Sequence, residues 1–150
     1  MSESHFHSLL SRAERAGIFR MPYAVDLALE EAAESLEYPI HRIDLSQVTT
    51  KEAFLAAVGE ALAFPDWYGH NWDALADCLQ DLGWLPAAGY VIILDHCDGI
   101  HGRAEADFVT LMQVFQDAAA TWRDDDVPFW CLVDMQADGI AWLPTVSLPG

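Results

Sequence analysis

Residues 64–82 read FPDWYGHNWDALADCLQDL, and their spacing predicts one amphipathic helix that follows a turn. Pro65 ends the preceding helix, and Asn71 stands where the N-cap of the new helix is expected. Gly69, in the turn between them, allows a backbone conformation that other residues resist. The apolar face of the helix is a stripe at helical spacing, formed by Trp72, Leu75, Leu79 and Leu82.

Opposite this stripe lies an acidic ridge, defined as Asp73, Asp77 and Asp81. Side chains four residues apart lie above one another on a helix, so the three carboxylates form one surface. Like charges at this spacing each disfavour the helix by roughly 0.2–0.5 kcal/mol. The stretch contains no lysine or arginine to offset them. The pattern therefore favours a surface that meets a partner over an ordinary solvated acidic face.

The same stretch resembles the signature of the barstar family, whose members are intracellular inhibitors of small secreted ribonucleases. The signature is an aromatic pair, Gly, Asn, and then Asp-Ala-Leu-x-Asp-Cys-Leu, and it occupies residues 67–79 of this chain. The resemblance implies a small three-stranded parallel sheet packed against helices. It also implies that the acidic helix and the loop before it plug a ribonuclease active site, with carboxylates in the places of RNA phosphates.

The resemblance also assigns partner-binding residues one by one. Asp77 matches the aspartate that is inserted deepest among the cations of the enzyme, and Asp73 matches the aspartate one turn before it. The other contact positions that it implies are Trp67, Gly69, Asn71, Ala74 and a peripheral Asp117. The chief departure is Ala76, which stands where the family has a contacting tryptophan.

Outside the acidic helix, short apolar runs alternate with helical periodicities, which predicts an α/β fold with a parallel sheet. Strands are expected at residues 17–21, 40–45, 90–94 and 129–133, with the apolar run 90–94 at the centre of the sheet. One helix should begin near Asp26 and bury a stripe that includes Leu27. Another should follow a capping box of Thr49 and Glu52, and a third should span residues 108–122.

The length of 150 residues predicts a single barstar-like domain, and a hydrophobic content of 53% with six tryptophans can fill its core. The core of this domain is expected at residues 39–134, between an N-terminal extension, 1–38, and a C-terminal tail, 135–150. The extension has a strand–helix pattern of its own. It would add a fourth parallel strand through a right-handed crossover.

The charge balance restricts the class of partner. With 24 acidic and 7 basic residues the net charge is −17, which repels nucleic acid and attracts a basic protein. The expected partner is a small basic ribonuclease of the extracellular type, or a related toxin, and the free protein is expected to be a monomer. No apolar run suits a membrane span or a signal peptide, which predicts a cytoplasmic protein without a membrane contact. Cys78, Cys97 and Cys131 lack CxxC spacing and are expected to be reduced and buried.

Three alternatives remain open at this stage. Asp73 and Asp77 have the separation of a retaining glycosidase pair, but both lie on one exposed helix with nothing to hold them around a sugar. The six histidines form no HxxxH or HExxH pattern, and residues 95–98 with His101 are interpreted as a loop at a strand end. The third alternative is an acidic module that binds a basic protein other than a nuclease. The sequence therefore predicts no catalytic residue, no metal ligand and no cofactor.

Overall fold

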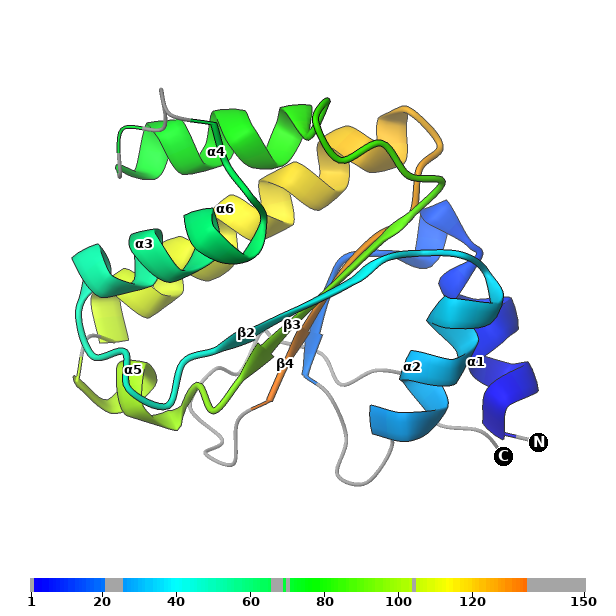
Figure 1. Cartoon of the computed structure of the whole chain (residues 1–150), viewed down its shortest axis with the longest axis horizontal. Coiled ribbons are helices and arrows are strands. Elements are labelled where there is room, and N and C mark those ends of the chain that lie inside the picture. The colour runs from blue at the N-terminus through cyan, green and yellow to red at the C-terminus, as the bar shows by residue number, and fades with distance from the viewer. Residues whose placement is uncertain (1, 21–25, 66–68, 70, 104, 135–150) are drawn as a thin grey trace.

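The computed structural model describes residues 2–20, 26–65, 69, 71–103 and 105–134 (Figure 1). Its elements in chain order are α1 (Ser2–Leu10), η1 (Ala13–Arg15), β1 (Ile18–Arg20), α2 (Asp26–Ser35), β2 (Ile40–Asp44), α3 (Lys51–Ala61), α4 (Trp72–Asp81), β3 (Tyr90–Asp95), α5 (Asp98–Arg103), α6 (Glu105–Asp124) and β4 (Phe129–Val133). The predicted α/β fold is confirmed.

The four strands form one parallel sheet in the order β1-β4-β3-β2. The predicted central strand is confirmed, since β3 lies between β4 and β2. The N-terminal extension supplies the fourth strand: β1 pairs with β4, with Ile18 beside Cys131. The sheet thus joins residues from both ends of the described chain.

Helices cover both faces of the sheet, with α1 and α2 on one face and α3 and α6 on the other (Figure 1). Side chains of β3 alternate between the two: Val91 and Ile93 join the core beneath α1 and α2, whereas Ile92 and Leu94 join the core beneath α3 and α6. This alternation is the two-residue period of a strand. Because both faces are covered, the run that the sequence shows as continuously apolar is fully buried.

Two of the polar contacts that bind the extension to the rest of the fold are donated by side chains of β4 and α6. The indole Nε1 of Trp130 in β4 donates to the Leu10 carbonyl at 3.0 Å, and Nη2 of Arg123 in α6 donates to the Ala16 carbonyl at 2.7 Å. Both contacts satisfy polar groups at the boundary of a buried layer. The extension is therefore packed into the sheet as well as hydrogen-bonded to it.

Helix α4 lies farther from the sheet than α6 and packs against that helix (Figure 1). The indole Nε1 of Trp122 in α6 donates to the Leu79 carbonyl of α4 at 2.8 Å, which connects the two helices by a hydrogen bond. Leu75, Cys78 and Leu79 are fully buried in this contact. As a result α4 has one face in the core and one face on the outside of the molecule.

The structure corrects several details of the sequence interpretation. The N-cap of α3 is Thr50, not Thr49, and its Oγ1 accepts from the Ala53 N–H at 3.2 Å. Leu27 is 68% exposed and does not belong to the buried stripe of α2. Asp98 begins the short helix α5, where only a loop was expected, and α1 was not predicted at all. The predicted C-terminal tail, 135–150, lies outside the described residues.

The cysteine prediction holds, since Cys78, Cys97 and Cys131 are free thiols with fully buried side chains. Burial raises the pKa of Cys97 and of Cys131 well above the ordinary thiol value. None of the helices described is both long enough and apolar enough to cross a membrane.

Candidate partner-binding surface

The start of α4 is held by one amide side chain. Asn71 is the predicted N-cap, and its Oδ1 accepts from the Ala74 N–H at 2.8 Å, which satisfies a backbone donor at the helix end. Its Nδ2 donates to the Gly69 carbonyl at 3.3 Å. The same side chain therefore fixes the loop and the first turn of the helix relative to each other.

Gly69 also serves this arrangement. The backbone conformation expected of this turn involves residues 66–68 and 70, which lie outside the described residues. A Cβ at this position would lie 3.1 Å from Nδ2 of Asn71. The absence of a side chain leaves the space that the Asn71 amide occupies.

The acidic ridge is exposed along its whole length. Asp73, Asp77 and Asp81 all point to solvent, while Leu75 and Leu79 on the opposite side of α4 are fully buried. The predicted amphipathic helix is confirmed. Since the apolar face is anchored in the core, the three carboxylates are presented from a rigid support and not from a loop.

The ridge produces a negative field at the surface of α4. None of the described lysines and arginines forms an ion pair with these three aspartates. Burial, and then the charges of Asp77 and Asp81, raises the pKa of the Cys78 thiol to about 11. The helix macrodipole favours Asp73 in the first turn and disfavours Asp81 in the last. Helix stability alone would therefore not place Asp81 in the last turn, nor three like charges at i, i+4 spacing.

One cation that the sequence interpretation missed lies at the start of α4. Nζ of Lys51, the first residue of α3, is 5.3 Å from the ring centroid of Trp72, the first residue of α4. This is the geometry of a cation–π contact. Trp72 itself is only partly buried and packs at the margin of the core. Residues 21 positions apart in the chain carry no local pattern that could predict such a contact.

The structure brings most of the predicted contact residues together. Gly69, Asn71, Asp73 and Asp77 lie on one loop and one helix, and Ala74, half-buried, lies one turn before Cys78. Asp117 is exposed on the neighbouring helix α6. Trp67 lies outside the described residues. Ala76 is half-buried and adds little apolar area to the surface.

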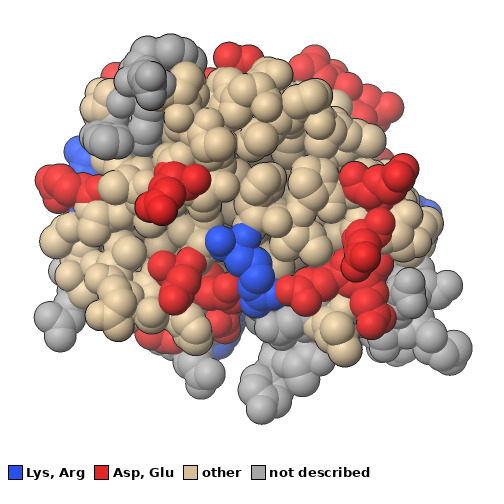
Figure 2. Space-filling model, in the orientation of Figure 1, with Lys and Arg blue, Asp and Glu red and all other residues tan. Residues whose placement is uncertain are grey.

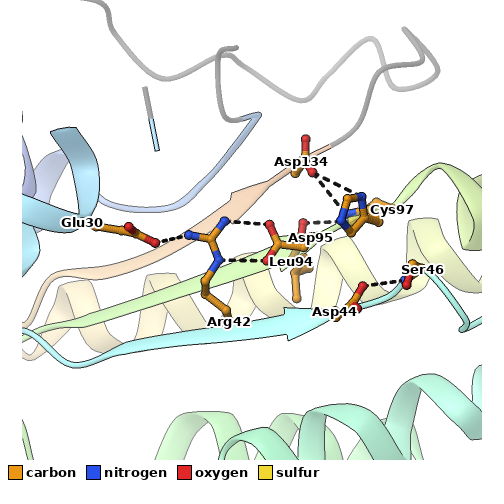
Figure 3. Close-up of polar contacts among 9 residues, drawn as sticks. Glu30, Arg42, Asp44, Ser46, Leu94, Asp95, Cys97 and Asp134 are labelled. Atoms are coloured by element: carbon orange, nitrogen blue, oxygen red, sulfur yellow. Dashed lines mark hydrogen bonds and ion pairs between the residues drawn. The ribbon is translucent and has the colours of Figure 1, made fainter. Parts of the chain in front are cut away.

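A second polar cluster, remote from α4, lies where α2 meets the edge of the sheet (Figure 3). Nε and Nη2 of Arg42 in β2 donate to the two carboxylate oxygens of Asp95 in β3, both at 2.9 Å, and Nη1 also pairs with Glu30 of α2. The bidentate contact with Asp95 raises the pKa of Arg42 further above its already high value. The charge of Arg42 is therefore neutralised within the protein. The face of the molecule in Figure 2 shows many acidic groups and few basic ones.

Further acidic side chains lie at the carboxyl ends of the strands (Figure 3). The backbone N–H of His96 donates to Oδ2 of Asp134 at 3.2 Å, and Asp44 accepts from the Ser46 N–H at 3.0 Å, which lowers the pKa of Asp44. No group of three histidine, cysteine or carboxylate side chains among the described residues could hold a metal ion. An open groove of about 380 Å³ between β2 and α3 has no lining residue from α4.

Fold and surface together describe an α/β protein that exposes a rigid acidic helix. The family model of barstar, the barnase inhibitor, matches residues 38–134 of the chain. The protein belongs to the barstar family. The matched residues include the whole of α4 and the loop before it.

Other comparisons inform the fold only. No curated protein matches the chain. A chain in the structure of Drosophila ORC bound to DNA has a TM-score of 0.51 at 11% identity, covering 94% of this protein and 82% of that chain. A chain in the structure of Drosophila ORC bound to AT-rich DNA and Cdc6 has a TM-score of 0.44 at 11% identity, covering 89% of this protein and 47% of that chain. The first shares an overall fold with this protein, and at such low identity it indicates nothing about function.

Proposed function

We propose that the protein inhibits a small basic ribonuclease by covering its active site with α4 and the loop before it. The observation that supports this proposal is the ridge: three exposed carboxylates on a helix whose other face is buried, with no ion pair to a cation among the described residues. Membership of a family described as barnase inhibitors supports the same kind of partner.

The chemistry of a ribonuclease explains why such a ridge would bind. The enzyme must cluster arginine, lysine and histidine around the scissile phosphate, and an unfilled cationic pocket binds anions that are held at the right spacing. A helix holds Asp73 and Asp77 one turn apart, about 6 Å between their Cβ atoms. In this proposal the protein binds and blocks, and catalyses nothing itself. The net charge of −17 accelerates the encounter with a cationic enzyme.

The test is inhibition of barnase by the purified protein and by two ridge variants. Asp77→Ala should cost about 2–5 kcal/mol of binding, because the cations of the enzyme would be buried without their anion. Asp81→Ala should cost much less, since Asp81 lies one turn farther from the loop. Glu34→Ala, which removes an exposed carboxylate from α2 on the opposite side of the sheet, is the control of equal charge.

The stability of the Asp77 variant separates a binding role from a structural one. Alanine removes two repulsive contacts, with Asp73 and Asp81, and has the higher helix propensity, so the free energy of unfolding should rise by about 1 kcal/mol. That corresponds to an increase in Tm of about 2–4 °C. An Asp77→Ala variant that unfolds, or an Asp81→Ala variant that loses more binding, would place the interface elsewhere.

Stopped-flow mixing provides a second measurement. The association rate should fall steeply between about 0.02 and 0.5 M salt, because the charges that steer the encounter become screened. A rate that does not change with salt would remove electrostatic steering from the proposal. Failure to inhibit barnase, combined with tight binding of a basic protein that is not a nuclease, would favour the acidic interaction module instead.

A further inference from the structure

Lys51 is the single lysine of the chain, and the structure places its ammonium over the ring of Trp72, at the start of α4. It follows the N-cap Thr50 as the first residue of α3, and its ammonium lies over the ring of Trp72 at the start of α4. Asp73, the first carboxylate of the ridge, is the next residue after Trp72. A positive charge therefore lies at the first residue of α4, one position in the chain before the first carboxylate of the ridge.

A lysine as the first residue of α3 does not stabilise that helix. The first turn of a helix has a positive electrostatic potential, which favours acids and disfavours a lysine. The attraction that offsets this cost comes from another element, through the ring of Trp72. The position of the ammonium is thus set by the surface of α4.

The ammonium also has unused hydrogen-bonding capacity. It carries three N–H donors, and among the described residues its interaction is with the face of the Trp72 ring, with no hydrogen bond or ion pair to a carboxylate. Water satisfies these donors while the protein is free. A partner that covers the start of α4 displaces this water and must provide acceptors, because an unpaired buried ammonium is costly.

We propose that Lys51 is a specificity-determining contact of this surface, and that it fits a partner whose cationic face carries a carboxylate beside the cations that meet Asp73 and Asp77. The proposal deepens the proposed function and rests on it for the position of the interface. Lys51 would thereby discriminate among basic proteins. A partner with only cations opposite Lys51 would be repelled, whereas a partner with a carboxylate there would gain an ion pair.

The test uses two blocked peptides that need no ribonuclease. Each contains four arginines and two glycines, and one ends in Glu while the other ends in Gln. Their binding to the full-length protein is measured at low salt by NMR titration of backbone amides. The wild type should bind the Glu peptide about twofold more tightly than the Gln peptide, although the Glu peptide has the smaller positive charge.

Two variants decide the role of Lys51. Lys51→Met keeps an apolar stem on Trp72 but removes the charge, and should reverse the preference, so that the Gln peptide binds about threefold more tightly. Lys51→Arg should keep the wild-type order. Equal preferences in the wild type and in Lys51→Met would overturn the proposal. Unchanged amide shifts away from residues 51 and 72 show that the variants are folded, and a separate barnase assay shows whether the proposed function itself fails.

Discussion

Replacement of Phe6 by alanine tests whether the N-terminal extension and the barstar-like part of the chain unfold as one unit. Phe6 lies in α1 and is fully buried in the core beneath α1 and α2, together with Leu10 and Trp130. Trp130 belongs to β4, and Cys131, the residue that follows it, points into the core on the opposite face of the sheet. The sheet is therefore the layer that both cores share.

The magnitude follows from the size of the cavity. Replacement of a fully buried phenylalanine by alanine costs about 3–5 kcal/mol, because apolar contacts are lost and the cavity closes only in part. If the two cores unfold together, the whole of this cost reduces the free energy of unfolding of both. Since about 1.4 kcal/mol changes an equilibrium tenfold, the unfolded population should rise about a hundredfold to a few thousandfold.

Thiol labelling of Cys131 measures this change on the far side of the sheet. The side chain is fully buried and its pKa is raised by that burial, so a reagent reacts with it only when the core opens. With Phe6→Ala, the labelling rate of Cys131, followed by peptide mapping, should rise by the factor above. Leu27→Ala is the matched control, because Leu27 is 68% exposed on α2 and its loss should cost less than about 0.5 kcal/mol.

One result would refute this reasoning. If circular dichroism shows that Phe6→Ala loses helix while the labelling rate of Cys131 stays at the wild-type value, the extension unfolds without the rest of the sheet. The prediction of a single domain over residues 1–150 would then be wrong.

The remaining predictions concern pH, packing and the helix cap. Burial lowers the pKa of the folded-state His41 below its ordinary value of 6.5. As the pH falls, the unfolded chain therefore takes up the proton before the folded chain does, and the stability that neutral His41 contributes above pH 6.5 is lost below that value. Urea unfolding at pH 7 and 5 should show a smaller loss for His41→Gln, and an equal loss would contradict this. Gly89→Ala should cost about 1–3 kcal/mol in the same assay, since a Cβ would lie 2.7 Å from the buried ring of Tyr38, whereas Gly102→Ala, with nothing within 4 Å, should change little. Asn71→Ala should cost about 1 kcal/mol of stability, while Asn71→Asp should keep the cap; equal losses would mean that the cap bond is not what stabilises the start of α4.

The acidic helix and its cap could be predicted because their causes are local. The spacing of Leu75 and Leu79 against Asp73 and Asp77 already separates a buried face from an exposed one. The bond from Asn71 to the Ala74 N–H spans only three residues. Such patterns appear in the sequence because the atoms that interact are neighbours along the chain.

Predictions failed where the outcome depended on how elements and side chains pack and not on the local pattern. Thr49 and Thr50 are both good N-caps, and the position of α3 against the core decides for Thr50. Leu27 fits a helical stripe, yet the packing of α2 leaves it outside. Nothing in the sequence indicates the space that the Asn71 side chain takes beside Gly69, where a Cβ would lie 3.1 Å from Nδ2.

The amino-acid order alone was sufficient for the α/β class, the central strand predicted at 90–94 and the exposed carboxylates of α4, because hydrophobic periodicity depends only on neighbours in the chain. It was not sufficient for the contacts of the cations. Arg42 pairs with Asp95, 53 residues away, and Lys51 lies over Trp72, and both contacts exist only because separate elements pack side by side. Tertiary packing therefore decided that Arg42 is neutralised by a carboxylate whereas Lys51 lies over an aromatic ring at the start of α4, since electrostatic interactions depend on distance in space and not on distance along the chain.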